Sequence, residues 1–523
     1  MHRNGVVSVG IVVGALGLFG GSTGVMAHQG LQHLVPPGAA PPAGANIPDW
    51  LLRVRGMGAK ERSRILAHAD RVGEMRAARV KVEGPRSRSW QSDGVGAVWV
   101  GTASREITPP RGCPLAGYGD RLKTVPLLYN PRLDPLYYSK LYRPSEGVAD
   151  PLLVKAIVID NGERRVCLVG VDSIGLTQLI YEDVLQAVQP LGLDRDALLI
   201  GGSHSHGGGG DAADQFLWWL ATADILDFRI YSHVVEEIAG AISDAVADLE
   251  PARVGVGHSD AGVGLSRNRR GDPVIDPEIA VIRVDGIDHQ PKAVVFNFAV
   301  HGTTIGAENM LFTSGCMGQA RVELERRLGS DVVAVFLNGA EGDVAPNGQG
   351  GTDQWERARI WGEVMADQTE GLYESIPTAT EVELAGAHIF VNLPEPFLRP
   401  GFFLEPPTPG NVKIPISGLV EQLNTNFSGV RVGDAAFVSM PGEAITQIGL
   451  DVKAHGDQIG LPGSFVVGLA NGHLGYMTTR EEYFQGGYEA GATFFGAGTG
   501  EIMVDSASRV LDLLVPPSGS RRD

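Results

Sequence analysis

His204 and His206 are the residues of this chain whose type and spacing most directly indicate chemistry. They stand two positions apart in residues 203–210, which follow the apolar run 197–202 and include four consecutive glycines. On an extended segment, residues two apart point to the same side, so both imidazoles can face one site. One ring can bind a metal while the other donates a hydrogen bond to a substrate. A polar loop with one hydrogen-bonded histidine is the alternative interpretation.

Four other apolar runs also end in a residue that can bind a ligand. In open α/β sheets, sites form beyond the carboxyl ends of strands, so five such strand ends predict one shared site. Neutral imidazole is the commonest protein metal ligand. Two imidazoles and a carboxylate such as Glu443 leave a position open for water, which is the arrangement of a catalytic zinc. The residues at the four other strand ends are His301, Glu341 with Asp343, Glu443, and His473 with Tyr476.

The elements that must position these residues are strands and helices in alternation. Continuous apolar runs separated by amphipathic segments predict an α/β fold, a large single catalytic domain with a mixed, mostly buried β-sheet and the site at the carboxyl ends of strands. We expect strands at 97–103, 152–160, 165–172, 197–202, 278–285, 292–300, 331–338, 434–440 and 464–470. We expect helices at 180–189, 233–249, 317–328, 354–374 and 443–454, and a last helix at 500–514.

The N-terminal region reads as a targeting segment and a linker. Residues 1–27 combine a basic start, an apolar stretch and small residues before a cleavage point after Ala27, which predicts a signal peptide and a secreted or periplasmic protein. A retained membrane anchor is the alternative, but the apolar stretch is short for a spanning helix. We expect a Pro/Ala/Gly linker at 28–48, a basic helical extension at 49–96, the hydrolase domain at 97–516 and a disordered tail at 517–523. A solvated helix on an acidic body is preferred for the extension over peripheral contact with a membrane surface.

Composition narrows the class of partner. The chain has 523 residues, a net charge of −18, and 43% hydrophobic and 20% charged residues, which is ordinary for a globular protein. Nucleic acid is excluded as the main partner, because binding phosphate needs clustered Lys and Arg. Three cysteines allow at most one disulfide. The sequence does not indicate an oligomeric state.

From about residue 98 to residue 514, the chain resembles the neutral/alkaline (non-lysosomal) ceramidases. These are secreted or membrane-associated zinc amidases that split ceramide into sphingosine and a fatty acid. The motifs that carry the resemblance occur in the family's order. They are "VGTASREITPPRGCPLAGYG" (100–119), "SHSHGGGGD" (203–211), "FNFAVHGTT" (296–304), "GAEGDVAPN" (339–347), "MPGE" (440–443) and "GYMTTREEYFQGGYEAGATFFG" (475–496).

The resemblance implies a site residue by residue. It implies one zinc per chain, held by His204, His301, Glu443 and Tyr476. It also implies that three residues bind the substrate amide and the developing oxyanion: His206, Arg269 and Tyr488. Arg269 has the neighbours Arg267 and Arg270 as competitors for this role.

The chain departs from the family's pattern in two ways. Ala345 stands where the family carries a serine, so an acyl-enzyme through this position is excluded, whereas attack by zinc-activated water needs no serine. We therefore expect Asp343, Ala345 and Asn347 to shape one wall of the site. The family also ends in a β-sandwich, and no such run of short alternating strands follows residue 514 here.

These observations predict a secreted zinc-dependent amidohydrolase. The substrate would be ceramide or a related N-acyl lipid or small-molecule amide, cleaved at its N-acyl amide bond by zinc-activated water. One alternative is a metal-dependent esterase or lactonase on the same fold. The other is a lipid- or metal-binding homologue that has lost catalysis.

Overall fold

The computed structural model describes residues 59–80, 86–123, 138–398, 414–416 and 423–515. Most of its strands form two sheets. The eight-stranded sheet has the order β13-β11-β10-β8-β3-β5-β6-β7, and the five-stranded sheet has the order β1-β16-β19-β20-β22. The strands of the first sheet are β3 (Trp99–Glu106), β5 (Leu153–Asp160), β6 (Arg165–Val171), β7 (Leu198–Gly202), β8 (Glu250–Ser259), β10 (Ile279–Gly286), β11 (Pro291–Phe298) and β13 (Val333–Asn338). Those of the second are β1 (Ser87–Gln91), β16 (Leu384–Asn392), β19 (Asn424–Val432), β20 (Ala435–Ser439) and β22 (Gly463–Val467).

The eight-stranded sheet bends sharply between β3 and β8. These two strands pair at only two positions, Trp99 with Pro251 and Val100 with Glu250. The far edge of the sheet then returns to the inner face of β6, where a Cβ built on Gly170 would lie 2.5 Å from the carbonyl oxygen of Phe336 in β13. The glycine therefore allows the two backbones to touch. The two halves of this sheet and the five-stranded sheet form three sides around a shared apolar core.

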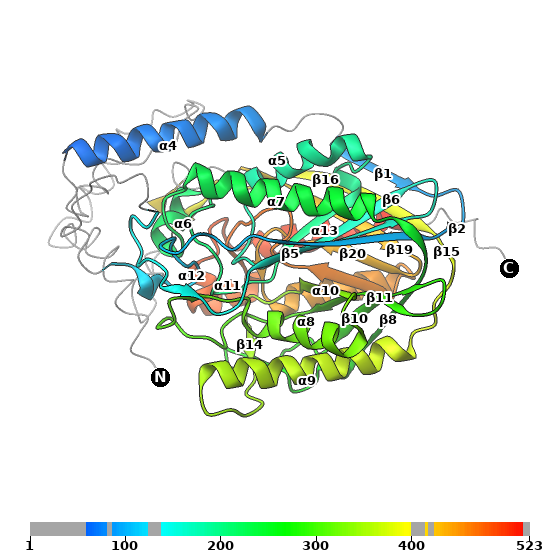
Figure 1. Cartoon of the computed structure of the whole chain (residues 1–523). Helices are drawn as coiled ribbons and strands as arrows, with labels where there is room; N and C mark the ends of the chain where they lie inside the picture. Colours follow the sequence, from blue (N-terminus) through cyan, green and yellow to red (C-terminus); the bar gives the residue numbers. More distant parts are fainter. Residues whose placement is uncertain (1–58, 81–85, 124–137, 399–413, 417–422, 516–523) are drawn as a thin grey trace.

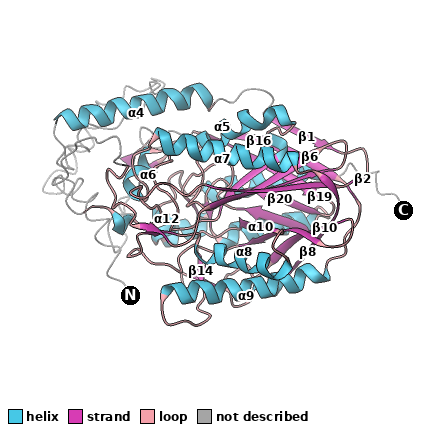
Figure 2. Ribbon diagram, viewed as in Figure 1, coloured by secondary structure: helices cyan, strands magenta, loops and turns pink. Residues whose placement is uncertain are grey.

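Side chains alternate between this inner core and three outer layers. In β5, Ile157 faces the inner core and Val158 faces outward, as the two-residue period of a strand requires. In β10, Ile282 faces inward and Val281 outward. Helices cover each outer face, as Figures 1 and 2 show for α5 and α7 on one side and α8 and α9 on the opposite side. The covering helices are α5 (Gln178–Val188), α7 (Phe228–Ala247), α8 (Gly315–Leu328), α9 (Gln354–Ser375), α10 (Thr446–Gln458) and α13 (Thr499–Leu514).

Three parallel strand pairs bring their carboxyl ends together. The pairs are β6 with β7, β11 with β13, and β20 with β22. The ends are joined across the two sheets: the Gly468 N–H donates to Asn338 O at 2.9 Å, and Asn338 Nδ2 donates to Ser203 O at 3.1 Å. The loops that carry the candidate site residues therefore start from one region of the molecule. They leave strands β7, β11, β13, β20 and β22.

Short elements complete the described chain. The short strands are β2 (Gly96–Ala97), β4 (Gly147–Val148), β9 (Ser266–Asn268), β12 (Leu311–Phe312), β14 (Val344–Pro346), β15 (Glu381–Val382), β17 (Phe397–Leu398), β18 (Ile414–Pro415), β21 (Glu443–Ala444) and β23 (Tyr476–Met477). The remaining helices are α4 (Ala59–Arg79), α6 (Phe216–Ala221), α11 (Arg480–Gln485) and α12 (Tyr488–Gly491).

Helix α4 lies on the body through both apolar and charged contacts. Its Ala69 and Val72 are buried. Arg76 pairs with the buried Asp214, and Arg79 pairs with Asp183. The basic helix expected in the N-terminal extension thus docks on aspartates of the body. The expected boundary at residue 97 also assigns Ser87–Gln91 to the extension, whereas the structure pairs this strand with β16 at the sheet edge.

The α/β class with buried sheet is confirmed, and all nine expected strands are present. The strands are divided between two sheets rather than one. All three cysteines are free and buried. Within the described ranges, no helix is long and apolar enough to cross a membrane. The expected signal peptide, linker and C-terminal tail lie outside the described residues.

Candidate metal centre

The imidazoles of His204 and His301 face each other at the centre of the converging strand ends. His204 follows β7 and His301 follows β11, and their Nε2 atoms lie 3.0 Å apart. Each Nδ1 faces a backbone carbonyl, that of Ile174 at 2.7 Å and that of Glu341 at 3.1 Å. A carbonyl oxygen only accepts, so each Nδ1 carries the proton and each Nε2 carries a lone pair. Two lone pairs directed at one point fit a cation between them.

Glu443 and Tyr476 add two oxygens to the same point. Strands β21 and β23 pair in parallel with Glu443 opposite Tyr476, so the two residues are neighbours. Glu443 Oε2 lies 3.4 Å from His204 Nε2 and 3.6 Å from His301 Nε2. Tyr476 Oη lies 3.3 Å from His301 Nε2. The structure thus brings together the four residues expected to hold the metal, and Glu443 Oε2 is buried with no hydrogen-bond partner among the described residues.

The loop after β7 reaches this point at a conformational cost. His204 has a φ of 63°, in the left-handed region that few residues other than glycine adopt. Its carbonyl lies against Gly302, where a Cβ would approach the His204 oxygen to 2.0 Å. A side chain at position 302 would therefore push the two histidine loops apart. Local strain of this kind is commonly found at functional sites.

The electrostatics favour the ligand-competent forms of the cluster. Burial alone would raise the pKa of Glu443, but the facing His204, His473 and His301 lower that pKa well below its usual value. Burial and the nearby Arg269 lower the pKa of His301 well below its usual value. A carboxylate that stays ionised beside a neutral imidazole is the donor set that zinc prefers.

His473 supports the carboxylate from behind. Its Nδ1 accepts a hydrogen bond from the Gly475 N–H at 3.1 Å, so the ring proton lies on Nε2, which is 3.5 Å from Glu443 Oε1. The ring packs edge-on against Trp218, with centroids 3.9 Å apart. His473 was not included in the expected ligand or substrate-binding set, although its position after an apolar strand gave the signal. Partners of this kind orient metal ligands.

His206 lies beside the cluster with both ring nitrogens unused. Its ring centroid is 5.0 Å from that of His204 and 5.4 Å from that of His301. Within the described chain, neither nitrogen has a hydrogen-bond partner, although the residue is buried. Gly117, with φ of 99°, makes room for the ring, because a Cβ there would lie 2.6 Å from His206 Cγ. Burial lowers the pKa of His206 well below its usual value, so the ring is neutral and keeps one donor and one acceptor.

Arg269 is the arginine that reaches the cluster. Its Nη2 donates to Tyr476 Oη at 2.9 Å and to a backbone carbonyl at 2.6 Å, and its Nε pairs with Glu489 at 2.9 Å. Arg270 turns away to the other oxygen of Glu489, at 3.1 Å. Arg267 is exposed in β9. Burial alone would lower the pKa of Arg269, but Tyr476 and Glu489 raise it above its usual value, so the guanidinium stays charged.

Tyr488 lies at the outer edge of the cluster. Its ring packs edge-on against Tyr476 with centroids 5.3 Å apart, and the Arg269 guanidinium lies 6.0 Å from its centroid. The residue is 61% exposed. Tyr488 therefore stands where the buried cluster meets solvent, within reach of an entering substrate.

Hydrogen bonds to neighbouring segments hold the loop that carries Asp343, Ala345 and Asn347. Asp343 accepts from the N–H and hydroxyl of Thr446 at 2.7 and 2.6 Å and from Asn268 at 2.9 Å. Asn347 Nδ2 donates to a backbone carbonyl at 3.1 Å. Ala345 is buried and pairs with Arg267 in the β14–β9 ribbon. Asp343 and Asn347 therefore fix the shape of the loop.

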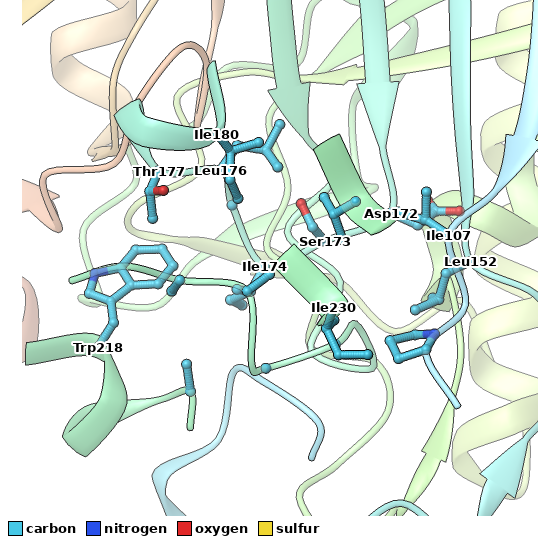
Figure 3. Close-up of a pocket in the computed structure, with 18 residues that line it drawn as sticks. Ile107, Leu152, Asp172, Ser173, Ile174, Leu176, Thr177, Ile180, Trp218 and Ile230 are labelled. Carbon is cyan, nitrogen blue, oxygen red and sulfur yellow. The ribbon is translucent and has the colours of Figure 1, made fainter. Parts of the chain in front are cut away.

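Figure 3 shows the lining residues of an apolar pocket, which adjoins the cluster through Ile174 and Trp218. Two of the residues that line it also contact residues of the cluster. The Ile174 carbonyl accepts a hydrogen bond from His204, and Trp218 packs against His473. Of the described residues that line it, none is one of the four candidate ligands. The other large apolar side chains that line it include Ile107, Leu152, Leu176, Ile180 and Ile230.

Known proteins resemble this chain along most of its length. The family model described as neutral/alkaline non-lysosomal ceramidase, N-terminal, matches residues 136–383. The neutral ceramidase of Mycobacterium tuberculosis is 25% identical over 69% of this chain and 71% of its own length. The neutral ceramidase of Pseudomonas aeruginosa is 22% identical over 69% of this chain and 67% of its own length. The crystal structure of the Pseudomonas enzyme is similar in fold, with a TM-score of 0.65 and 20% identity over 82% of this chain and 77% of that chain.

Proposed function

We propose that the chain, which resembles the neutral/alkaline non-lysosomal ceramidases in sequence and in fold, is a secreted, zinc-dependent amidohydrolase. Its substrate is ceramide or a related N-acyl lipid or amide, which it cleaves at the amide bond. The convergence of two imidazole nitrogens, a carboxylate and a phenol on one point is the observation that carries the proposal. These donors come from four separate strand ends, which a merely structural polar cluster does not require.

His204, His301, Glu443 and Tyr476 would hold the metal. When bound, a divalent ion there supplies Lewis acidity, which lowers the pKa of a water molecule and polarises a substrate carbonyl. Burial raises the pKa of Tyr476 well above its usual value, and the Arg269 guanidinium, which donates to Tyr476 Oη, opposes this rise. His473 Nε2 faces the second oxygen of Glu443 at 3.5 Å.

The remaining site residues act on the substrate itself. His206 is neutral, buried and unpaired among the described residues, so it can donate to the amide or move a proton to the leaving nitrogen. The fixed charge of Arg269 lies where negative charge develops on the carbonyl oxygen, and preorganised charge of this kind lowers the barrier. Ala345 carries no hydroxyl, so no acyl-enzyme forms through that position and water attacks directly.

The apolar pocket supports a substrate with an aliphatic group. We assign it to the acyl chain, because its walls include the residues that contact His204 and His473 (Figure 3). Replacing the lining residue Ala213 by leucine should narrow it. Turnover of a long-chain amide should then fall more than turnover of the matching acetyl amide. An equal loss of turnover on both substrates would show that the acyl chain does not bind in this pocket.

A substrate comparison tests the function. The purified protein is assayed on labelled ceramide, on simple N-acyl amides and on an ester with the same acyl chain, with and without a chelator. Amide cleavage that the chelator abolishes supports the proposal. Cleavage of the ester alone would favour the esterase or lactonase function, and no cleavage of any substrate by metal-loaded protein would favour a binding protein. His301→Ala should abolish all turnover.

The proposal that the protein is secreted rests on its N-terminal sequence. The basic start, the apolar stretch and Ala27 fit a cleaved signal. Expression with the native N-terminus, followed by mass spectrometry of protein recovered outside the cytoplasm, should give a chain that begins at His28. An intact residue 1 in all recovered protein would contradict it.

A further inference from the structure

Glu341 is a buried carboxylate that the proposed ligand set does not use. It follows β13 and is fully buried, and within the described chain neither of its carboxylate oxygens has a hydrogen-bond partner. One ligand atom each of Glu341, His204 and Glu443 lie within 4.8 Å of one another. We propose that Glu341 is a further carboxylate ligand of the same metal ion, an inference that rests on the proposed metal-dependent function.

A backbone contact and close packing position the carboxylate of Glu341 beside the four candidate ligands. The backbone carbonyl of Glu341 accepts from His301 Nδ1 at 3.1 Å, so one residue orients a ligand through its main chain and enters the cluster through its side chain. Gly468 makes room for the carboxylate, because a Cβ there would lie 2.5 Å from Glu341 Oε2. The close fit against the end of β22 restricts where the side chain can go.

The charges around Glu341 call for a cation. Three carboxylate oxygens are buried here without hydrogen bonds from described residues: both of Glu341 and one of Glu443. An ionised carboxylate is unfavourable in a buried site unless a nearby positive charge compensates it. The nearby guanidinium of Arg269 donates no hydrogen bond to them among the described contacts, since its Nε and Nη2 bind Glu489, Tyr476 and a backbone carbonyl. A metal ion bound to both carboxylates would satisfy all three oxygens.

The geometry indicates one ion rather than two. His204 belongs both to the group with Glu341 and Glu443 and to the group with His301. Its Nδ1 is already bonded to the Ile174 carbonyl, which leaves one nitrogen for a metal. Both groups therefore share a single ion. Two carboxylates, two imidazoles and a phenol form an oxygen-rich site, which suits Mn²⁺ better than a site with one carboxylate does.

Direct metal binding tests this assignment. Apo-protein is titrated with Zn²⁺ and with Mn²⁺ against a chromogenic chelator for the wild type, Glu341→Gln and Glu341→Leu. The control is Glu381→Gln, which removes an exposed carboxylate in β15. We expect both Glu341 variants to bind Zn²⁺ at least about 10–100-fold more weakly, as for loss of a metal-site partner, with a larger loss for Mn²⁺. The control should bind like the wild type.

Other results would overturn the assignment. Wild-type affinity in both Glu341 variants would exclude ligation, and weakening in Glu341→Leu alone would show that a neutral polar side chain suffices at this position. X-ray absorption of the zinc-loaded wild type gives a measure that does not depend on variant folding: four or fewer protein ligands would contradict the proposal. A wild type that binds no metal would instead refute the proposed function.

Discussion

Tyr476→Phe tests whether the phenol oxygen of Tyr476, the least usual of the four proposed metal donors, contributes to metal binding. The substitution removes one oxygen and keeps the ring, which packs against Tyr488 with centroids 5.3 Å apart. The lost oxygen accepts from Arg269 at 2.9 Å and lies 3.3 Å from His301 Nε2. The change therefore removes a proposed metal donor and leaves the guanidinium with one unmet hydrogen bond.

The size of the effect follows from these contacts. A hydrogen bond to a charged group contributes about 1.5–3 kcal/mol. If the metal interaction of the phenol is of the same order, zinc affinity should fall by about 10–100-fold, since about 1.4 kcal/mol corresponds to tenfold. The assay is competition with a chromogenic chelator, and turnover should fall with affinity at limiting zinc.

Tyr488→Phe is the matched control. It also removes a phenol oxygen, but from a residue at the exposed edge of the cluster. Zinc affinity should stay at the wild-type value, whereas the Michaelis constant should rise if Tyr488 contacts the substrate. Unchanged zinc affinity in Tyr476→Phe would refute the reasoning that the phenol is a ligand.

Three further changes test separate parts of the site. Gly117→Ala places a Cβ 2.6 Å from the His206 ring at a φ of 99°, so turnover should fall while zinc content, measured by elemental analysis, is retained. Asp343→Asn directs an amide group at the side chain of Asn268 and should lower the free energy of unfolding by about 1–3 kcal/mol, seen as a lower thermal midpoint. Burial raises the pKa of Asp211 from 3.8 to about 7, so the folded state holds a proton that the unfolded state releases between these values. Stability should therefore decline as pH rises from about 4 to about 7. Asp211→Asn should reduce this decline when thermal midpoints at pH 5 and pH 8 are compared, and a decline as large as that of the wild type would contradict the assignment.

The fold was predictable where strands are buried on both faces. The mostly apolar runs at residues 152–160 and 331–338 lie between the inner core and a helical layer, so most of their positions are apolar and the runs are easy to see. Strands β8 and β19 were missed because polar residues and glycines interrupt them. The division into two sheets depends on the short β3–β8 pairing and on Gly170, which no periodicity records.

The candidate site was predictable in part from strand ends. His204, His301 and Glu443 each follow an apolar run, and that pattern alone places them at one edge. The prediction that Tyr476 belongs to the site came from the family resemblance. In the structure, the parallel pairing of β23 with β21 places Tyr476 beside Glu443. The choice among three adjacent arginines needed the structure, because only side-chain geometry separates Arg269 from its neighbours.

Glu341 and His473 show what strand-end reasoning leaves open. Both were recognised as polar residues after apolar strands, but sequence gives no distance between loops. The structure places His473 behind Glu443 and Glu341 within the cluster. Hydrogen bonds distinguish the two buried carboxylates: Asp343 accepts from Thr446, whereas Glu341 has no hydrogen-bond partner among the described residues and is therefore the one proposed as a ligand.

The most direct test of the central claim is metal content measured together with amide hydrolysis on one preparation. We expect about one zinc per chain by elemental analysis, loss of N-acyl amide hydrolysis on chelation, and recovery when zinc is returned. Hydrolysis that persists in metal-free protein would contradict the central claim, as would stoichiometric zinc in the His301→Ala variant.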